Sequence, residues 1–164
     1  MAETNELDPA HIGTVGEALF CAAYAPPSPI PHILLDHIEE ISPEWVTPEE
    51  GSLRVFNSQD NHYFSIEDAN GETTRWEKDA EISYSYFARD GDTVPEDHQL
   101  GGQWMLEFPV EIKTGPRAKV EANQRTVMEY LAANTDYQPI IVRLGLDGMP
   151  DEFVVEEVEL VQSD

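Results

Sequence analysis

The stretch MLEFPVEIK at residues 105–113 decides the fold, because it combines the apolar character of a core strand with charges at fixed positions. Strand side chains point alternately to opposite faces, so Glu111 and Lys113 share one face while Val110 and Ile112 share the other. The chain has three lysines against 33 acidic residues, and one of those lysines lies here, two residues after a glutamate. A carboxylate and an ammonium side by side at a strand end can hold a divalent metal and a phosphate together.

The residues around this strand predict a single domain with a mixed sheet and few helices. Alternating or short apolar runs predict further strands at 53–56, 62–66, 73–76, 79–87, 138–144 and 153–161. Helices are expected at about 14–25, 33–41 and 117–133, the last ending at Asn134 as its C-cap. Asn70-Gly71 predicts a tight hairpin turn. We therefore expect a flexible acidic leader at 1–12 followed by one domain at 13–164.

The composition is strongly acidic, with a formal net charge of −24 spread along the whole length. Dispersed acidity with very few lysines resembles the proteins of extreme halophiles, and it predicts an origin in a halophilic archaeon or a virus of one. High charge keeps a protein soluble but strains the compact state by self-repulsion, and molar salt screens that strain. Because salt also screens long-range repulsion, the acidity argues only weakly against a DNA substrate.

The remaining composition bears on compartment. Cys21 is the single cysteine, so an intramolecular disulfide is excluded. The first nine residues are polar and acidic, unlike a signal peptide, and the apolar run at 18–25 is too short to span a bilayer. We expect a cytoplasmic protein that does not bind membranes.

Carboxylates and amides gather on the elements around Lys113. Asp79 and Glu81 share one face of the strand at 79–87, and a long loop at 88–103 joins that strand to the one bearing Glu111. Gln124 lies on the apolar stripe of the following helix, between Val120 and Val127. Magnesium prefers carboxylate oxygens and retains several waters, so one carboxylate from each of two adjacent strands can supply a site for it.

At these residues the chain resembles the PD-(D/E)xK nuclease superfamily, whose restriction-endonuclease-like fold is a mixed β-sheet flanked by helices in the α/β class. The resemblance covers roughly residues 13–25 and 75–144, with Glu111-Ile112-Lys113 as the (D/E)xK element. It implies DNA phosphodiester hydrolysis dependent on Mg²⁺ or Mn²⁺, and members of this fold often work as dimers, so a homodimer is possible. Asp79 and Glu111 would be the metal ligands, with Glu81 as an alternative ligand because it shares the face of Asp79. The chain departs from the family pattern at Lys78, which stands where the family has a proline before its aspartate.

The resemblance also implies roles for other residues. Lys113 would act as general base or charge stabiliser, Gln124 would position water or substrate, and Glu17 would be an auxiliary acid. Glu17 has a second reading, because Thr14-Val15-Gly16-Glu17 forms a capping box.

Three basic residues near the last predicted helix form the best candidate patch for phosphate contacts: Arg117, Lys119 and Arg125. A helix face carrying ion pairs to Glu121 and Glu129 is an equally simple interpretation.

A different class of function also fits the sequence. The same or a similar α/β fold can serve as a non-catalytic acidic interaction or regulatory module, or as a DNA mimic that binds a basic partner. Convergence of Asp79 or Glu81 with Glu111 and Lys113 in space would favour the nuclease.

Overall fold

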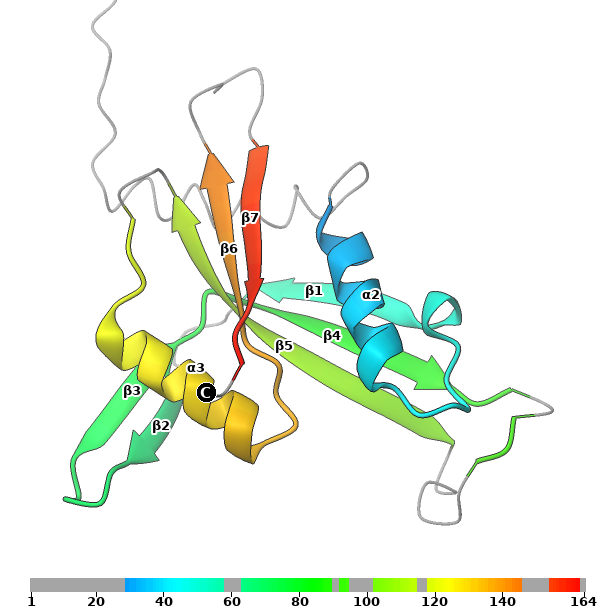
Figure 1. Cartoon of the computed structure of the whole chain (residues 1–164), viewed down its shortest axis with the longest axis horizontal. Coiled ribbons are helices and arrows are strands. Elements are labelled where there is room, and N and C mark those ends of the chain that lie inside the picture. The colour runs from blue at the N-terminus through cyan, green and yellow to red at the C-terminus, as the bar shows by residue number, and fades with distance from the viewer. Residues whose placement is uncertain are drawn as a thin grey trace, which may run out of the picture.

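A computed structural model describes residues 29–57, 63–89, 92–94, 102–114, 118–145 and 154–162. Its centre is a five-stranded mixed sheet in the order β1-β4-β5-β6-β7 (Figure 1). The strands are β1 (Ser52–Asn57), β4 (Ala80–Phe87), β5 (Gln103–Thr114), β6 (Ile140–Gly145) and β7 (Val154–Leu160). The β5–β6 pair is parallel and the other pairs are antiparallel. This architecture confirms the predicted α/β class with a mixed sheet.

Two α-helices, one short 3-10 helix and a separate hairpin complete the described fold. Helix α2 (Ile30–Ile41) and the short 3-10 helix η1 (Pro48–Glu50) precede the sheet, and α3 (Ala122–Asn134) joins β5 to β6. The hairpin of β2 (Tyr63–Glu67) and β3 (Thr73–Glu77) forms a two-stranded sheet that lies beside α3 (Figure 1). Its turn contains Gly71 at φ 80°, which confirms the hairpin predicted from Asn70-Gly71.

The larger hydrophobic core lies on the face of the sheet that α2 covers. The even-numbered residues of β4 and β5 point into it. Four of them are fully buried: Ile82, Tyr84, Phe108 and Val110. They meet the apolar side of α2, where Leu34 and Ile38 are also fully buried. The period-two pattern in the sequence therefore sorts these strands correctly into two faces.

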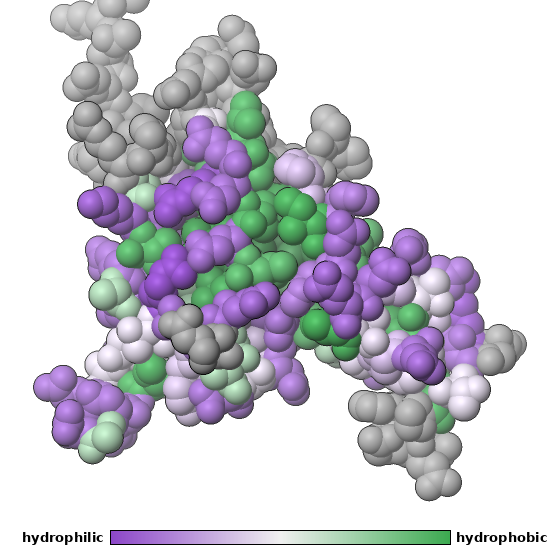
Figure 2. Space-filling view, viewed as in Figure 1, coloured by the Kyte–Doolittle hydropathy of each residue, from purple (hydrophilic) through white to green (hydrophobic). Residues whose placement is uncertain are grey.

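A second, smaller core forms between α3, the β2–β3 hairpin and β6. Its buried members are Trp76, Val127, Met128, Leu131, Ile141 and Val161. This core lies on the face to which Glu111 and Lys113 point, so it borders the candidate site. In the space-filling view, hydrophobic residues gather over the middle of the molecule and hydrophilic residues surround them (Figure 2).

Strand β5 accommodates Pro109 because its pairing with β6 begins only at the next residue. Pro109 pairs with Glu81 of β4, whereas pairing with β6 starts only at Val110. The carbonyl of Glu107 accepts a hydrogen bond from the Gln138 N–H, so the odd residues of this part of β5 direct their backbone groups toward β6. The missing N–H of Pro109 therefore removes no bond from the β4–β5 ladder.

The helix boundaries differ from the sequence predictions. Helix α2 begins at Ile30 instead of 33, because Pro31 occupies its first turn, where a missing N–H costs nothing. Helix α3 begins at Ala122 instead of 117, since the Ala118 carbonyl accepts a hydrogen bond from the Arg143 guanidinium at 2.7 Å and Glu121 provides the cap. Its C-cap is Thr135, one residue beyond the predicted Asn134.

None of the helices in the described ranges is long and apolar enough to cross a membrane.

Gly51 is required by close packing against Tyr84. A Cβ added at Gly51 would overlap the Tyr84 ring, whose hydroxyl donates a hydrogen bond to the Pro48 carbonyl at 2.9 Å. We predict that Gly51→Ala lowers the free energy of unfolding by about 1–3 kcal/mol, the usual cost of overpacking a core. Urea unfolding followed by tryptophan fluorescence measures it. Ser52→Ala at the neighbouring exposed position should change stability by less than about 0.5 kcal/mol, and equal stability of both variants would contradict this packing.

Candidate active site

The Glu111 carboxylate is the centre of the candidate site. Glu111 is 3% exposed and lies on β5, on the face opposite the larger core. Its Oε1 forms an ion pair with Lys113 Nζ at 2.8 Å and accepts from Gln124 Nε2 at 2.9 Å, and its Oε2 accepts from Trp76 Nε1 at 2.6 Å. A carboxylate removed from water needs such partners, and three donors from three elements supply them.

Gln124 links the start of α3 to the two charged groups. It is the third residue of the helix and forms a capping box with Glu121, in which its Oε1 accepts from the Glu121 N–H at 3.0 Å. The same Oε1 accepts from Lys113 Nζ at 3.2 Å, while Nε2 donates to Glu111. The first turn of α3 therefore holds the Gln124 amide between the Glu111 carboxylate and the Lys113 ammonium.

Lys113 lies two residues after Glu111 on the same face, and its side chain is 14% exposed. In the parallel pairing of β5 with β6, Lys113 is aligned with Arg143, a cation that the sequence analysis did not single out. Arg143 forms an ion pair with Glu157 at 3.5 Å and donates to the Ala118 carbonyl. A second cationic residue thus neighbours Lys113 in the sheet register, with its guanidinium bound to Glu157 and Ala118.

Asp79 immediately precedes the start of β4, beside β5. Its N–H donates to the Val110 carbonyl at 2.8 Å, and its Oδ2 accepts from the Ile112 N–H at 2.7 Å. The carboxylate continues the β4–β5 ladder by one hydrogen bond beyond the last paired residue, Ala80. This bond holds the Asp79 side chain against the backbone of the residue between Glu111 and Lys113.

Glu81, the alternative ligand, is engaged elsewhere. It is aligned with Pro109 and forms an ion pair with Lys78, which is 7% exposed. Burial raises the pKa of the Tyr137 hydroxyl, and the carboxylates of Glu107 and Glu81 raise it further. Of the two candidate acids on this segment, Asp79 is the one hydrogen-bonded to the strand segment of Glu111 and Lys113.

Two of the three candidate phosphate-contact residues, Lys119 and Arg125, lie in the described ranges. Arg125 donates to both carboxylate oxygens of Glu159 on β7, at 3.0 and 3.3 Å, and this hydrogen bonding raises the pKa of Arg125. Its ion-pair partner is therefore on β7, rather than Glu121 or Glu129 of the helix. Lys119 is exposed in the connection before α3. Glu17 and Arg117 lie outside the described residues.

Trp76 is a residue of this site that the sequence pattern did not single out, since it indicated only a strand at 73–76. It is 1% exposed and packs in the second core, yet its indole N–H reaches Glu111. The alternation along β3 predicts that Trp76 is buried. The sequence does not indicate which polar atom accepts the hydrogen bond of its indole.

The donor set fits a hard divalent cation. Asp79 and Glu111 offer carboxylate oxygens from neighbouring strands, which suits Mg²⁺ or Mn²⁺. Within the described ranges, no group of three or more His, Cys, Asp or Glu side chains lies close enough to hold a metal ion. Two carboxylates with water completing the shell match magnesium, which sheds its waters reluctantly.

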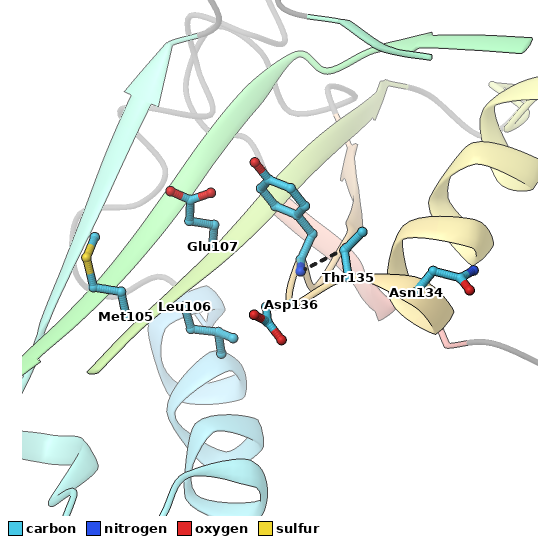
Figure 3. Close-up of a pocket in the computed structure, with 7 residues that line it drawn as sticks. Met105, Leu106, Glu107, Asn134, Thr135 and Asp136 are labelled. Carbon is cyan, nitrogen blue, oxygen red and sulfur yellow. Dashed lines mark hydrogen bonds between the residues drawn. The ribbon is translucent and has the colours of Figure 1, made fainter. Parts of the chain in front are cut away.

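A cavity of about 470 Å³ opens further along β5, between this strand and the connection from α3 to β6. Figure 3 shows the Glu107 carboxylate and Met105 on the strand side and Asn134, Thr135 and Asp136 opposite them. The Tyr137 N–H donates to Thr135 Oγ1 at 3.1 Å and orders that connection (Figure 3). Among the candidate catalytic residues that the structure describes, none lines this cavity.

Comparison with known proteins places this geometry in context. Residues 10–160 match the PD-(D/E)XK nuclease superfamily domain, and the fold is the restriction-endonuclease-like arrangement expected for it. Searches of curated proteins and of solved structures found no match.

The contact between Glu111 and Lys113 predicts a measurable energetic coupling. In a double-mutant cycle with Glu111→Gln and Lys113→Met, we expect a favourable coupling of about 1–3 kcal/mol in metal-free buffer, because both charges are nearly buried. Urea unfolding of the four proteins in EDTA measures it. The exposed Arg89–Glu50 pair is the control and should give less than about 1 kcal/mol. A coupling at Glu111–Lys113 no larger than the control would refute the buried pair.

Proposed function

Because this chain belongs to the PD-(D/E)XK nuclease superfamily, we propose that it is a divalent-metal-dependent nuclease that hydrolyses DNA phosphodiester bonds. The observation that carries the proposal is the buried Glu111 carboxylate in contact with Lys113 and Gln124, beside Asp79. We assign the activity to one domain over residues 13–164, working in the molar salt for which its acidity is suited.

In this proposal, Asp79 and Glu111 bind Mg²⁺ or Mn²⁺. Bound at these carboxylates, the ion would lower the pKa of its water and neutralise charge on the phosphate oxygens. Asp79 is preferred over Glu81 because the Ile112 N–H directs its carboxylate toward the Glu111 segment, whereas Glu81 is paired with Lys78. This preference is tested by comparing the cleavage activities of Asp79→Asn and Glu81→Gln. Asp79→Asn should abolish activity.

Lys113 stabilises the charge that develops on phosphorus. An ammonium has three N–H donors, and two are directed at Glu111 Oε1 and Gln124 Oε1. The third can donate to a phosphate oxygen of the substrate. Gln124 keeps the ammonium and the carboxylate in place, which is the kind of preorganisation that stabilises a transition state without further rearrangement.

Hydrolysis forms a bond from the water oxygen to phosphorus, with release of a proton from that water to the solvent. It breaks the bond from phosphorus to one ester oxygen, which takes up a proton in turn. Glu17 is proposed as an auxiliary acid near this reaction. Arg117 and Lys119 are proposed as phosphate contacts, whereas Arg125 contributes less because Glu159 already binds its guanidinium.

The test is cleavage of supercoiled plasmid and branched DNA in molar KCl, with Mg²⁺ or Mn²⁺ compared with EDTA. We expect nicking or cutting that EDTA abolishes, and a loss of about 100-fold or more in Lys113→Ala, because this charge acts at the reacting phosphate. Arg89→Ala, which removes an exposed cation paired with Glu50, should keep full activity.

Cleavage that survives in Lys113→Ala, with the variant shown to be folded, would overturn the assignment of the site. Absence of metal-dependent cleavage in the folded wild-type protein would overturn the nuclease itself.

One observation favours the alternative, a non-catalytic interaction module with acidic surfaces. Both oxygens of Glu111 and the carboxylate of Glu81 already have partners within the protein. Such a module would show no cleavage, and Mn²⁺ would not alter its thermal stability.

A further inference from the structure

We propose that Trp76 is a positioning residue that fixes the rotation of the Glu111 carboxylate. This inference rests on the proposed function, because it concerns the orientation of a proposed metal ligand. Trp76 touches neither substrate nor metal in this account, and it acts only through Glu111.

The division of donors between the two oxygens carries the argument. Trp76 Nε1 donates to Oε2 at 2.6 Å, whereas Lys113 and Gln124 both meet Oε1. With donors held on both oxygens, the carboxylate cannot turn about its terminal bond without losing a hydrogen bond in a site that is 3% exposed. Loss of the indole N–H would leave Oε2 buried without this donor, so that only the contacts at Oε1 would still orient the carboxylate.

The indole is itself held rigidly. Its ring stacks on Phe64 with centroids 5.7 Å apart and an interplanar angle of 24°. Phe64 in turn meets the Tyr137 ring edge-on at 5.1 Å, and the apolar side of α3 packs against Trp76. Tryptophan has two side-chain torsions, so this packing determines where its N–H points.

The chain position of Trp76 connects both proposed ligands. Trp76 on β3 stands three residues before Asp79, so one short segment carries the donor to Glu111 and the second carboxylate. Correct packing of the β2–β3 hairpin therefore positions both proposed ligands, Glu111 and Asp79, together. Groups that orient metal ligands commonly change metal affinity or activity by about 10–100-fold when removed.

The test is the affinity of the full chain for Mn²⁺, measured by isothermal titration calorimetry without DNA. We expect Trp76→Phe, which keeps an aromatic ring but lacks the N–H, to weaken Mn²⁺ binding by about 10–100-fold. At saturating Mn²⁺, kcat should fall while KM for DNA stays unchanged. Trp104→Phe is the matched control, because Trp104 lies on the same strand as Glu111 but packs against Tyr84 in the other core.

A second variant isolates the hydrogen bond from the packing. Benzothienylalanine at position 76 replaces the indole N–H by sulfur at nearly constant shape, and it should weaken Mn²⁺ binding as Trp76→Phe does. Mn²⁺ affinity within twofold of wild type in this variant, or equal losses in Trp76→Phe and Trp104→Phe, would overturn the inference. Wild-type protein that binds no Mn²⁺ would instead overturn the proposed function, and this inference with it.

Discussion

A buried carboxylate that must keep its partners is the constraint on which the rest of this structure depends. Glu111 brings together three elements distant in sequence, since its donors come from β3, β5 and α3. Removing any one donor leaves charge with less compensation in a nearly water-free place, which is costly. The hairpin, the central strand and the start of the helix are therefore held in one arrangement by polar contacts as well as by the second core.

Much of this arrangement could be predicted from the alternation of residues along β4 and β5. The period of two assigned Ile82, Tyr84 and Val110 to the core and placed Glu111 beside Lys113 on the other face. A strand has two faces, so one correct assignment determines the rest. The sequence also placed Gln124 on the apolar stripe of its helix, where an amide without a hydrogen-bond partner would be costly.

Other features could not be predicted, because they depend on contacts between distant residues. The start of α3 depends on the Arg143 guanidinium, which donates a hydrogen bond to the Ala118 carbonyl. Arg143 lies on a strand 25 residues away in sequence. The partner of Arg125 is Glu159 on β7, although acidic residues on its own helix were closer in sequence. The indole of Trp76 reaches Glu111 across 35 residues, and burial alone does not reveal its hydrogen bond.

The central claim is that Asp79 and Glu111 together form a metal centre in which Trp76, Lys113 and Gln124 orient the Glu111 carboxylate. The most direct test is a crystal structure of the protein soaked in Mn²⁺, with anomalous diffraction used to locate the ion. We predict one strong anomalous peak within coordination distance of both carboxylates, with the Trp76 and Gln124 hydrogen bonds to Glu111 retained. A peak at Glu81 instead, or full Glu111 density with no peak beside it at saturating Mn²⁺, would contradict the account.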